Sequence, residues 1–121
     1  MEQVRVRIGA CSVLNSGVTQ DYTIPVTFEG ELIYARREHY PNDDTRGTNE
    51  TLYRTNDGRL VVYVEEWSRW HGEPNHYRLV EVTEADLQPG GKFELLGQEA
   101  GYGRPLTLDE ALRRCAEYED A

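Results

Sequence analysis

The sequence predicts an α+β fold, in which an antiparallel six-stranded meander forms a curved sheet or half-barrel and packs against short C-terminal helices. Three observations lead to this class. Asn56-Asp57-Gly58 separates two runs of strand-forming residues, which is a strong hairpin signal. Upstream of this hairpin apolar and polar residues alternate, and after residue 82 the apolar residues recur at helical spacing. The 121 residues fit one domain, with strands at about 3–82 and helices at about 83–119.

The hairpin at residues 50–67 organises the rest of the predicted sheet. A three-residue loop with Gly58 at positive φ places Leu52 opposite Val62. A two-residue turn would instead pair Tyr53 with Val62 and scatter the apolar positions over both faces. We therefore expect the three-residue loop. Both faces of the hairpin then carry bulky residues, as in a central hairpin that is covered on each side.

Three further strands precede this hairpin, and a turn joins the first two. Residues 4–8 alternate valine or isoleucine with arginine, which predicts a half-buried strand that continues toward Leu14. A turn at residues 15–17 leads into the next strand at 18–28. Pro25 has no backbone N–H donor, so we expect that strand at an edge or a bulge of the sheet.

A tight turn at Glu29-Gly30 is expected to start the third strand, residues 31–37, and to pair Val26 with Ile33. The following segment, residues 38–49, is rich in turn formers and has little to bury. It predicts the longest loop of the chain, one that is mobile or faces a partner.

The last strand is expected near residues 76–82, and the apolar spacing then becomes helical. A short helix begins after Thr83, and a second one lies near residues 92–99. Thr107 and Glu110 form a capping box at the start of the final helix. Cys115 falls within the apolar stripe of that helix, which predicts packing in the core.

Composition limits the class of partner. The net charge of −9, from 22 acidic and 13 basic residues, disfavours nucleic acid as a direct ligand, because phosphate contacts need a positive patch. The same charge favours fast association with a basic partner, although acidity also serves solubility alone. No apolar run is long enough to span a bilayer, and the first residues do not form a signal peptide. We therefore expect a cytoplasmic protein with reduced thiols at Cys11 and Cys115.

Aromatic, arginine and histidine side chains gather in residues 67–77. These types are enriched at binding hot spots because they combine a large rigid area with directional donors. The candidate residues for binding a partner or ligand are Trp67, Arg69, Trp70, His71, His76 and Tyr77, together with Tyr53, Arg54 and Tyr63 of the hairpin. The alternative is that Trp67 and Tyr77 only close the end of the core around a polar turn.

No catalytic or metal-binding pattern stands out. The spacing of His71, Glu73 and His76 matches no zinc signature, and no cysteine pair completes one. The adjacent carboxylates of Glu65 and Glu66 would point to opposite faces of a strand, so they make a poor catalytic dyad. We therefore predict no catalytic residue, no metal and no cofactor.

The block YRTNDGRLVVY, residues 53–63, is followed by a polar loop, a further strand and leucine-rich short helices. This arrangement resembles the EXLDI-type small bacterial proteins, a family without an established activity. The sequence departs from the family at its end, where Leu106-Thr107-Leu108-Asp109-Glu110 replaces the family's signature. The resemblance implies a bacterial or bacteriophage origin and provides no catalytic residue.

Two functions fit these features. The first is a non-enzymatic interaction or regulatory module, whose acidic surface meets a basic protein and inhibits it, for example an enzyme that handles nucleic acid. The second is a protein that binds, sequesters or hydrolyses a nucleotide-like small molecule in a pocket lined by aromatic and arginine side chains. A homo-oligomer that pairs through an open sheet edge, such as the Pro25 strand, is a third arrangement.

Overall fold

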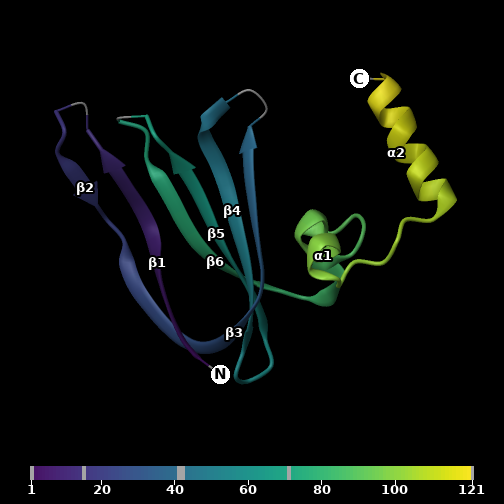
Figure 1. The fold of residues 1–121 in the computed structure, drawn as a ribbon, viewed down its shortest axis with the longest axis horizontal. Coiled ribbons are helices and arrows are strands. Elements are labelled where there is room, and N and C mark those ends of the chain that lie inside the picture. Colours follow the sequence, from purple (N-terminus) through teal and green to yellow (C-terminus); the bar gives the residue numbers. More distant parts are fainter. Residues whose placement is uncertain (1, 15, 41–42, 71, 121) are drawn as a thin grey trace. The chain divides into compact units, whose positions relative to one another are not determined.

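The chain forms one antiparallel sheet followed by short helices, which confirms the predicted α+β class and its curved six-stranded sheet (Figure 1). The computed structural model describes residues 2–14, 16–40, 43–70 and 72–120. It divides into two compact units, Met1–Thr83 with the sheet and Glu84–Ala121 with the helices. Each unit has its own internal packing.

The sheet closes on itself. Its strands are β1 (Glu2–Val13), β2 (Thr19–Asp21), β3 (Ile24–Tyr40), β4 (Asp43–Thr55), β5 (Leu60–Ser68) and β6 (Asn75–Val82). They are paired in the order β2-β1-β3-β4-β5-β6, and β1 also pairs with β6. In this additional pairing, Gly9, Ala10 and Cys11 lie opposite Tyr77, His76 and Asn75. A sheet whose first and last long strands meet is curved, with one concave face.

The central hairpin, β4–β5, has the predicted register. Leu52 lies opposite Val62, and the loop contains three residues that end in Gly58 at φ +87°. The N–H of Gly58 donates to the carbonyl of Thr55, and the Thr55 side chain bonds the Asp57 carboxylate. Both faces carry buried side chains as expected, with Leu52 and Val62 on one face and Tyr63 on the other.

The first hairpin is also confirmed. β2 and the start of β3 keep one continuous register against β1, with Cys11 opposite Asp21 and Arg7 opposite Pro25. The pairing of β3 with β4 begins only at Gly30, so around Pro25 the strand pairs with β1 alone. A residue without an N–H donor is tolerated at such a local edge.

The predicted turn at Glu29-Gly30 is wrong, because β3 continues through it from Ile24 to Tyr40. Gly30 lies opposite Thr55 and is buried. A Cβ atom there would come within 3.0 Å of the Phe28 ring and of the Arg54 carbonyl. Glycine in a strand often marks such a close approach rather than a turn.

The predicted loop at residues 38–49 is wrong as well. Its two ends belong to β3 and β4, and Pro41 and Asn42 lie outside the described residues. The segment is held by backbone pairing on both sides of β4, and Arg36 of β3 adds one ion pair within its own strand and one to β4. The Arg36 guanidinium lies 2.8 Å from the Glu38 carboxylate and 3.6 Å from that of Glu50. Strand pairing here overrides turn-forming composition.

The helical unit contains a 3-10 helix, η1 (Glu84–Leu87), and two α-helices, α1 (Glu94–Ala100) and α2 (Leu108–Asp120). Leu87, Phe93 and Leu96 are buried, and α1 ends at Gly101 in the left-handed conformation. The predicted capping box is confirmed. The N–H of Glu110 donates to the Thr107 hydroxyl, which in turn donates to the Glu110 carboxylate.

Cys115 is exposed, so its predicted role in core packing is wrong. Leu108 and Leu112, which share its helical stripe, are 74% and 58% exposed. Helical spacing of apolar residues defines a face of α2, but it does not provide a neighbour that covers that face. Among the described residues no helix has the length and apolar character needed to cross a membrane.

Candidate functional site

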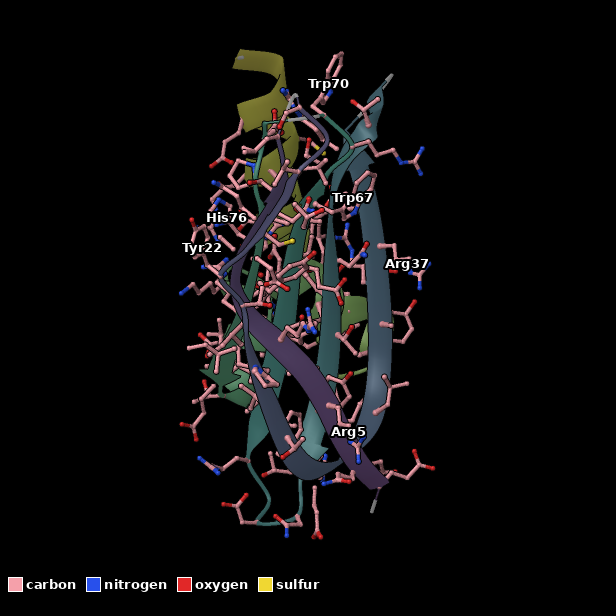
Figure 2. The ribbon with its side chains drawn as sticks, turned by 90° about the vertical axis from the view of Figure 1, so that its left-hand side faces the viewer. Arg5, Tyr22, Arg37, Trp67, Trp70 and His76 are labelled. Carbon is pink, nitrogen blue, oxygen red and sulfur yellow. The ribbon has the colours of Figure 1, made fainter. Side chains whose placement is uncertain are left out.

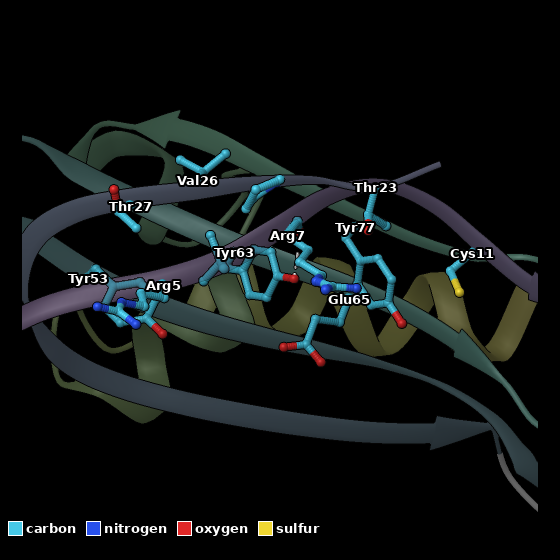
Figure 3. A pocket seen from close by; sticks show the side chains of 12 residues that line it. Arg5, Arg7, Cys11, Thr23, Val26, Thr27, Tyr53, Tyr63, Glu65 and Tyr77 are labelled. Carbon is cyan, nitrogen blue, oxygen red and sulfur yellow. Dashed lines mark hydrogen bonds between the residues drawn. The ribbon is translucent and has the colours of Figure 1, made fainter. Parts of the chain in front are cut away.

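A cavity of about 520 Å³ lies against the sheet and receives residues from five strands (Figure 3). We call it the tyrosine cavity, after its three aromatic side chains. Its lining residues are Arg5, Val6, Arg7, Cys11, Thr23, Pro25, Val26, Thr27, Tyr53, Tyr63, Glu65 and Tyr77. The sheet therefore brings residues between 5 and 27 together with the central hairpin, β4–β5, and the last strand, β6.

Strand alternation explains why the tyrosines share this cavity. Tyr63 and Glu65 are two residues apart on β5, so their side chains lie on the same face. Tyr77 of β6 lies opposite Glu65, and Tyr53 of β4 lies opposite Val61, which belongs to that face as well. One face of three neighbouring strands thus presents three phenols and one carboxylate.

Ring contacts and one hydrogen bond hold the phenols. The rings of Tyr63 and Tyr77 are nearly parallel, 15° apart with centroids separated by 6.4 Å. The Tyr53 and Phe28 rings pack edge to face, with an interplanar angle of 87° and centroids 5.5 Å apart. The Tyr63 hydroxyl donates to the backbone carbonyl of Arg7 at 2.7 Å, and so joins β5 directly to β1. The aromatic walls are therefore fixed before any ligand enters.

Glu65 is the acidic residue of the tyrosine cavity. Figure 3 shows its carboxylate near the gap between Tyr63 and Tyr77. Its described polar partner is the Asn49 amide, which donates from Nδ2 at 3.5 Å, the upper limit for a hydrogen bond. The carboxylate forms no ion pair within the described part of the chain.

The cationic side chains of the cavity belong to β1, and both residues are exposed. The Arg7 guanidinium donates to the Asp21 carboxylate at 2.9 Å, which neutralises its charge locally. The Arg5 guanidinium donates to the Gln3 amide oxygen at 3.4 Å. Thr23 donates to Asp21 from its backbone N–H and its hydroxyl, and these bonds keep the pKa of that carboxyl below its usual value. Asp21 is thus ionised and available to Arg7 at neutral pH.

Burial raises the pKa of Tyr53, Tyr63 and Tyr77, because the ionised phenolate loses more solvation than the neutral phenol. The negative charge of Glu65 raises all three further. For Tyr63, the hydrogen bond to Arg7 acts in the opposite direction. The carboxylate is therefore within electrostatic range of every phenol in the cavity.

Trp67 lies two residues after Glu65 on the same face of β5, and Arg69 follows the end of that strand. The Arg69 guanidinium carbon lies 5.5 Å from the centre of the Trp67 ring, within cation–π range. These two residues line a second hollow of about 260 Å³ with Arg37 and Asn49. Gly47, opposite Trp67, makes room for the indole, because a Cβ atom there would collide with the ring.

The remaining predicted residues do not enter the tyrosine cavity. Trp70 is 56% exposed at one end of the sheet unit, and its Nε1–H donates to the Thr45 hydroxyl at 2.7 Å (Figure 2). His76 and Arg54 alternate with Tyr77 and Tyr53, so they occupy the opposite face of the sheet. His71 lies outside the described residues.

The sequence therefore predicted the three tyrosines but not the charged and thiol side chains beside them, Arg5, Arg7, Cys11 and Glu65. Glu65 had a signal in the sequence, since it follows Tyr63 by two residues in a predicted strand. The three β1 residues had none, because only the long-range pairing of β1 places them here. Across the described ranges, no group of three or more histidine, cysteine or acidic residues is arranged to hold a metal ion.

Comparison of the chain with protein-family models, with curated proteins and with solved structures gave no match.

The raised pKa values of the three phenols predict that alkaline pH destabilises the protein. The folded state holds these protons more tightly than the unfolded chain, so the stabilisation is fully present below the ordinary tyrosine pKa of 10.0. It is lost as the pH rises through the higher folded-state values. We expect the free energy of unfolding, measured by urea titration, to fall above that pH.

In near-ultraviolet absorbance titrations, some of the eight tyrosines should ionise later in the folded protein than in denaturant. Replacing Tyr53, Tyr63 or Tyr77 by phenylalanine should each remove one late-ionising phenol. Identical titration curves in the folded and denatured states would contradict the burial of these side chains.

Proposed function

We propose that this protein binds a small ring-bearing molecule in the tyrosine cavity. The observation that supports this most is the convergence of three partly or fully buried tyrosines and a part-buried carboxylate from three adjacent strands. Rings of a ligand can stack on the phenol faces, while Glu65 and the tyrosine hydroxyls provide directional polar contacts. A nucleotide-like molecule and other polar aromatic molecules fit this description.

The size and rigidity of the cavity support the same function. Small-molecule sites commonly have volumes of about 300–1,000 Å³, and the tyrosine cavity has about 520 Å³. Its walls are strands, and Tyr63 is tied to Arg7 by a hydrogen bond. A preformed site of this kind spends little free energy on ordering side chains when the ligand binds. Such a cavity suits binding or sequestration of the ligand.

Cys11 provides a direct test, because it lines the tyrosine cavity and Cys115 in the helical unit is the protein's other thiol. Iodoacetamide modification of both cysteines would be followed by mass spectrometry, with and without 2-phenylethanol, 2-phenylethylammonium, phenylacetate or adenosine monophosphate. A ligand at about ten times its Kd leaves the cavity empty about one-tenth of the time, so the Cys11 rate should fall by about tenfold.

The rate at the exposed Cys115 should stay unchanged and serves as the internal control. If none of these molecules changed the Cys11 rate at millimolar concentration, the cavity would not be a binding site for small aromatic molecules.

A second candidate function, association with a basic protein and its inhibition, is supported by a different feature. Val13, Val18 and Trp70 are 37%, 58% and 56% exposed. The end of β1 adjoins the segment that follows Trp70, since the N–H of Gly72 donates to the Val13 carbonyl at 2.5 Å. An exposed tryptophan beside aliphatic side chains, on a chain of net charge −9, suits an aromatic anchor for a partner with a basic surface.

For this second function, the association rate with a basic partner captured on the immobilised protein should fall steeply as salt is raised. Trp70→Ala should speed dissociation, whereas Tyr22→Ala, which removes another exposed ring elsewhere on the sheet unit, should leave it unchanged. A rate that is indifferent to ionic strength would contradict the electrostatic part of this candidate function.

A further inference from the structure

We propose that the hollow beside Trp67 binds a phosphate group through the guanidinium groups of Arg37 and Arg69. We call it the arginine hollow, and its lining residues are Arg37, Asn49, Trp67 and Arg69. It shares no lining residue with the tyrosine cavity, so this second site does not depend on the ring-binding function proposed above.

The arginine hollow carries two positive charges on a protein whose net charge is −9. Seven of the described arginines form ion pairs with carboxylates. Arg37 and Arg69 form none with any described residue, and none of the described residues that line the hollow is acidic. Two cations at one hollow, without a counter-ion from the described chain, favour an anion with two negative charges.

The contact between Arg69 and Trp67 leaves the donors of the arginine available. The guanidinium carbon lies 5.5 Å from the centre of the indole ring, which restrains the side chain by a cation–π interaction. Such a contact does not use the N–H groups in hydrogen bonds. The five N–H donors of a guanidinium form a planar fork that matches two oxygens of a phosphate group.

Backbone pairing fixes the positions from which both arginines extend. Arg37 lies opposite Asn49 in the pairing of β3 with β4. Arg69 follows β5, and its backbone N–H donates to the Thr45 carbonyl at 2.8 Å. Binding of an anion therefore requires ordering of the two side chains and no rearrangement of the backbone.

Asn49 adds a neutral donor to the arginine hollow. Its amide nitrogen has two N–H groups, and one of them donates to the Glu65 carboxylate at 3.5 Å. Glu65 lines the tyrosine cavity rather than the arginine hollow, and the described ion pairs do not join it to Arg37 or Arg69. The carboxylate of Glu65 therefore does not occupy the position that we assign to the phosphate.

The size of the arginine hollow also favours a small anionic group. Its volume is about 260 Å³, whereas sites that enclose a drug-sized molecule usually measure about 300–1,000 Å³. A phosphate group can lie between the two arginines while the rest of a phosphate ester stays in solvent. Inorganic phosphate and a simple phosphate monoester are therefore suitable probes.

Inorganic phosphate, glycerol 3-phosphate and acetate test the site by calorimetry, at neutral pH and constant low ionic strength. We expect both phosphates to bind about tenfold more tightly than acetate, because a phosphate group carries close to two negative charges and acetate carries one. Tighter binding of the inorganic ion would identify free phosphate as the ligand, and equal or tighter binding of the ester would identify a phosphomonoester. Acetate that binds as tightly as both phosphates would overturn the assignment of a phosphate ligand.

Arg37→Gln and Arg69→Gln each remove one charge and one fork of donors. Each should weaken phosphate binding by about tenfold. Arg5→Gln is the matched control, because Arg5 is also exposed and forms no ion pair with the described residues. Figure 2 shows Arg5 toward the other end of the sheet unit from Trp67. Arg5→Gln changes the net charge by the same amount and should leave phosphate binding unchanged.

Modification of Cys11 by iodoacetamide locates the bound anion. Because Cys11 lines the tyrosine cavity, phosphate in the arginine hollow should leave its modification rate unchanged. Protection of Cys11 over the same range of phosphate concentration as the calorimetric signal would place the anion in the tyrosine cavity and overturn the assignment.

The two proposals fail in different experiments. No binding of either phosphate at millimolar concentration, or an equal loss of affinity in Arg5→Gln and the two hollow variants, would overturn the phosphate site and leave the tyrosine cavity untouched. Failure of the aromatic probes to protect Cys11 would overturn the ring-binding function alone. Phosphate binding that is weakened by Arg37→Gln and Arg69→Gln but not by Arg5→Gln confirms the arginine hollow.

Discussion

The whole site depends on the closure of the sheet by the short pairing between β1 and β6. Gly9, Ala10 and Cys11 lie opposite Tyr77, His76 and Asn75, and this contact links the first strand to the last. The hydrogen bond from Tyr63 to the Arg7 carbonyl adds a second link between residues 56 positions apart. Without these two links, Tyr53, Tyr63 and Tyr77 would lie on an open sheet face, and the cavity would lose the wall that β1 provides.

Strand alternation separates the side chains of the two sheet faces. On β5 and β6, strand alternation places Glu65 and Tyr77 toward the cavity, and Glu66 and His76 on the other face. Burial of a carboxylate costs free energy unless it retains solvent, accepts hydrogen bonds or gains a cation. The described hydrogen bond to Glu65 comes from the Asn49 amide at 3.5 Å.

The sequence predicted the parts of the fold that local chemistry determines. The three-residue loop at Gly58, the first hairpin and the capping box at Thr107 are as predicted, because each depends on residues close in sequence. The turn at Gly30 failed because its glycine serves a close approach inside a strand. Residues 38–49 failed because pairing with two neighbours outweighs their turn-forming composition. Both errors arise from contacts between segments distant in sequence.

The same division applies to the site. The tyrosines could be predicted from the alternation of the central hairpin and the last strand, since all of them share one face. Arg5, Arg7 and Cys11 could not, because a half-buried strand pattern at residues 4–8 does not say which strand it meets. The exposed Cys115 shows the same limit for α2, where spacing identified an apolar face without identifying what covers it.

The most direct test of this account is a solution NMR measurement of the contact between β1 and β6. Closure predicts cross-strand nuclear Overhauser effects between Gly9–Cys11 and Asn75–Tyr77, and between the Tyr63 ring and the backbone of Arg7, with slow amide exchange in both segments. If these contacts were absent and the β6 amides exchanged like those of a free edge strand, the sheet would be open. The tyrosine cavity as described would then not exist.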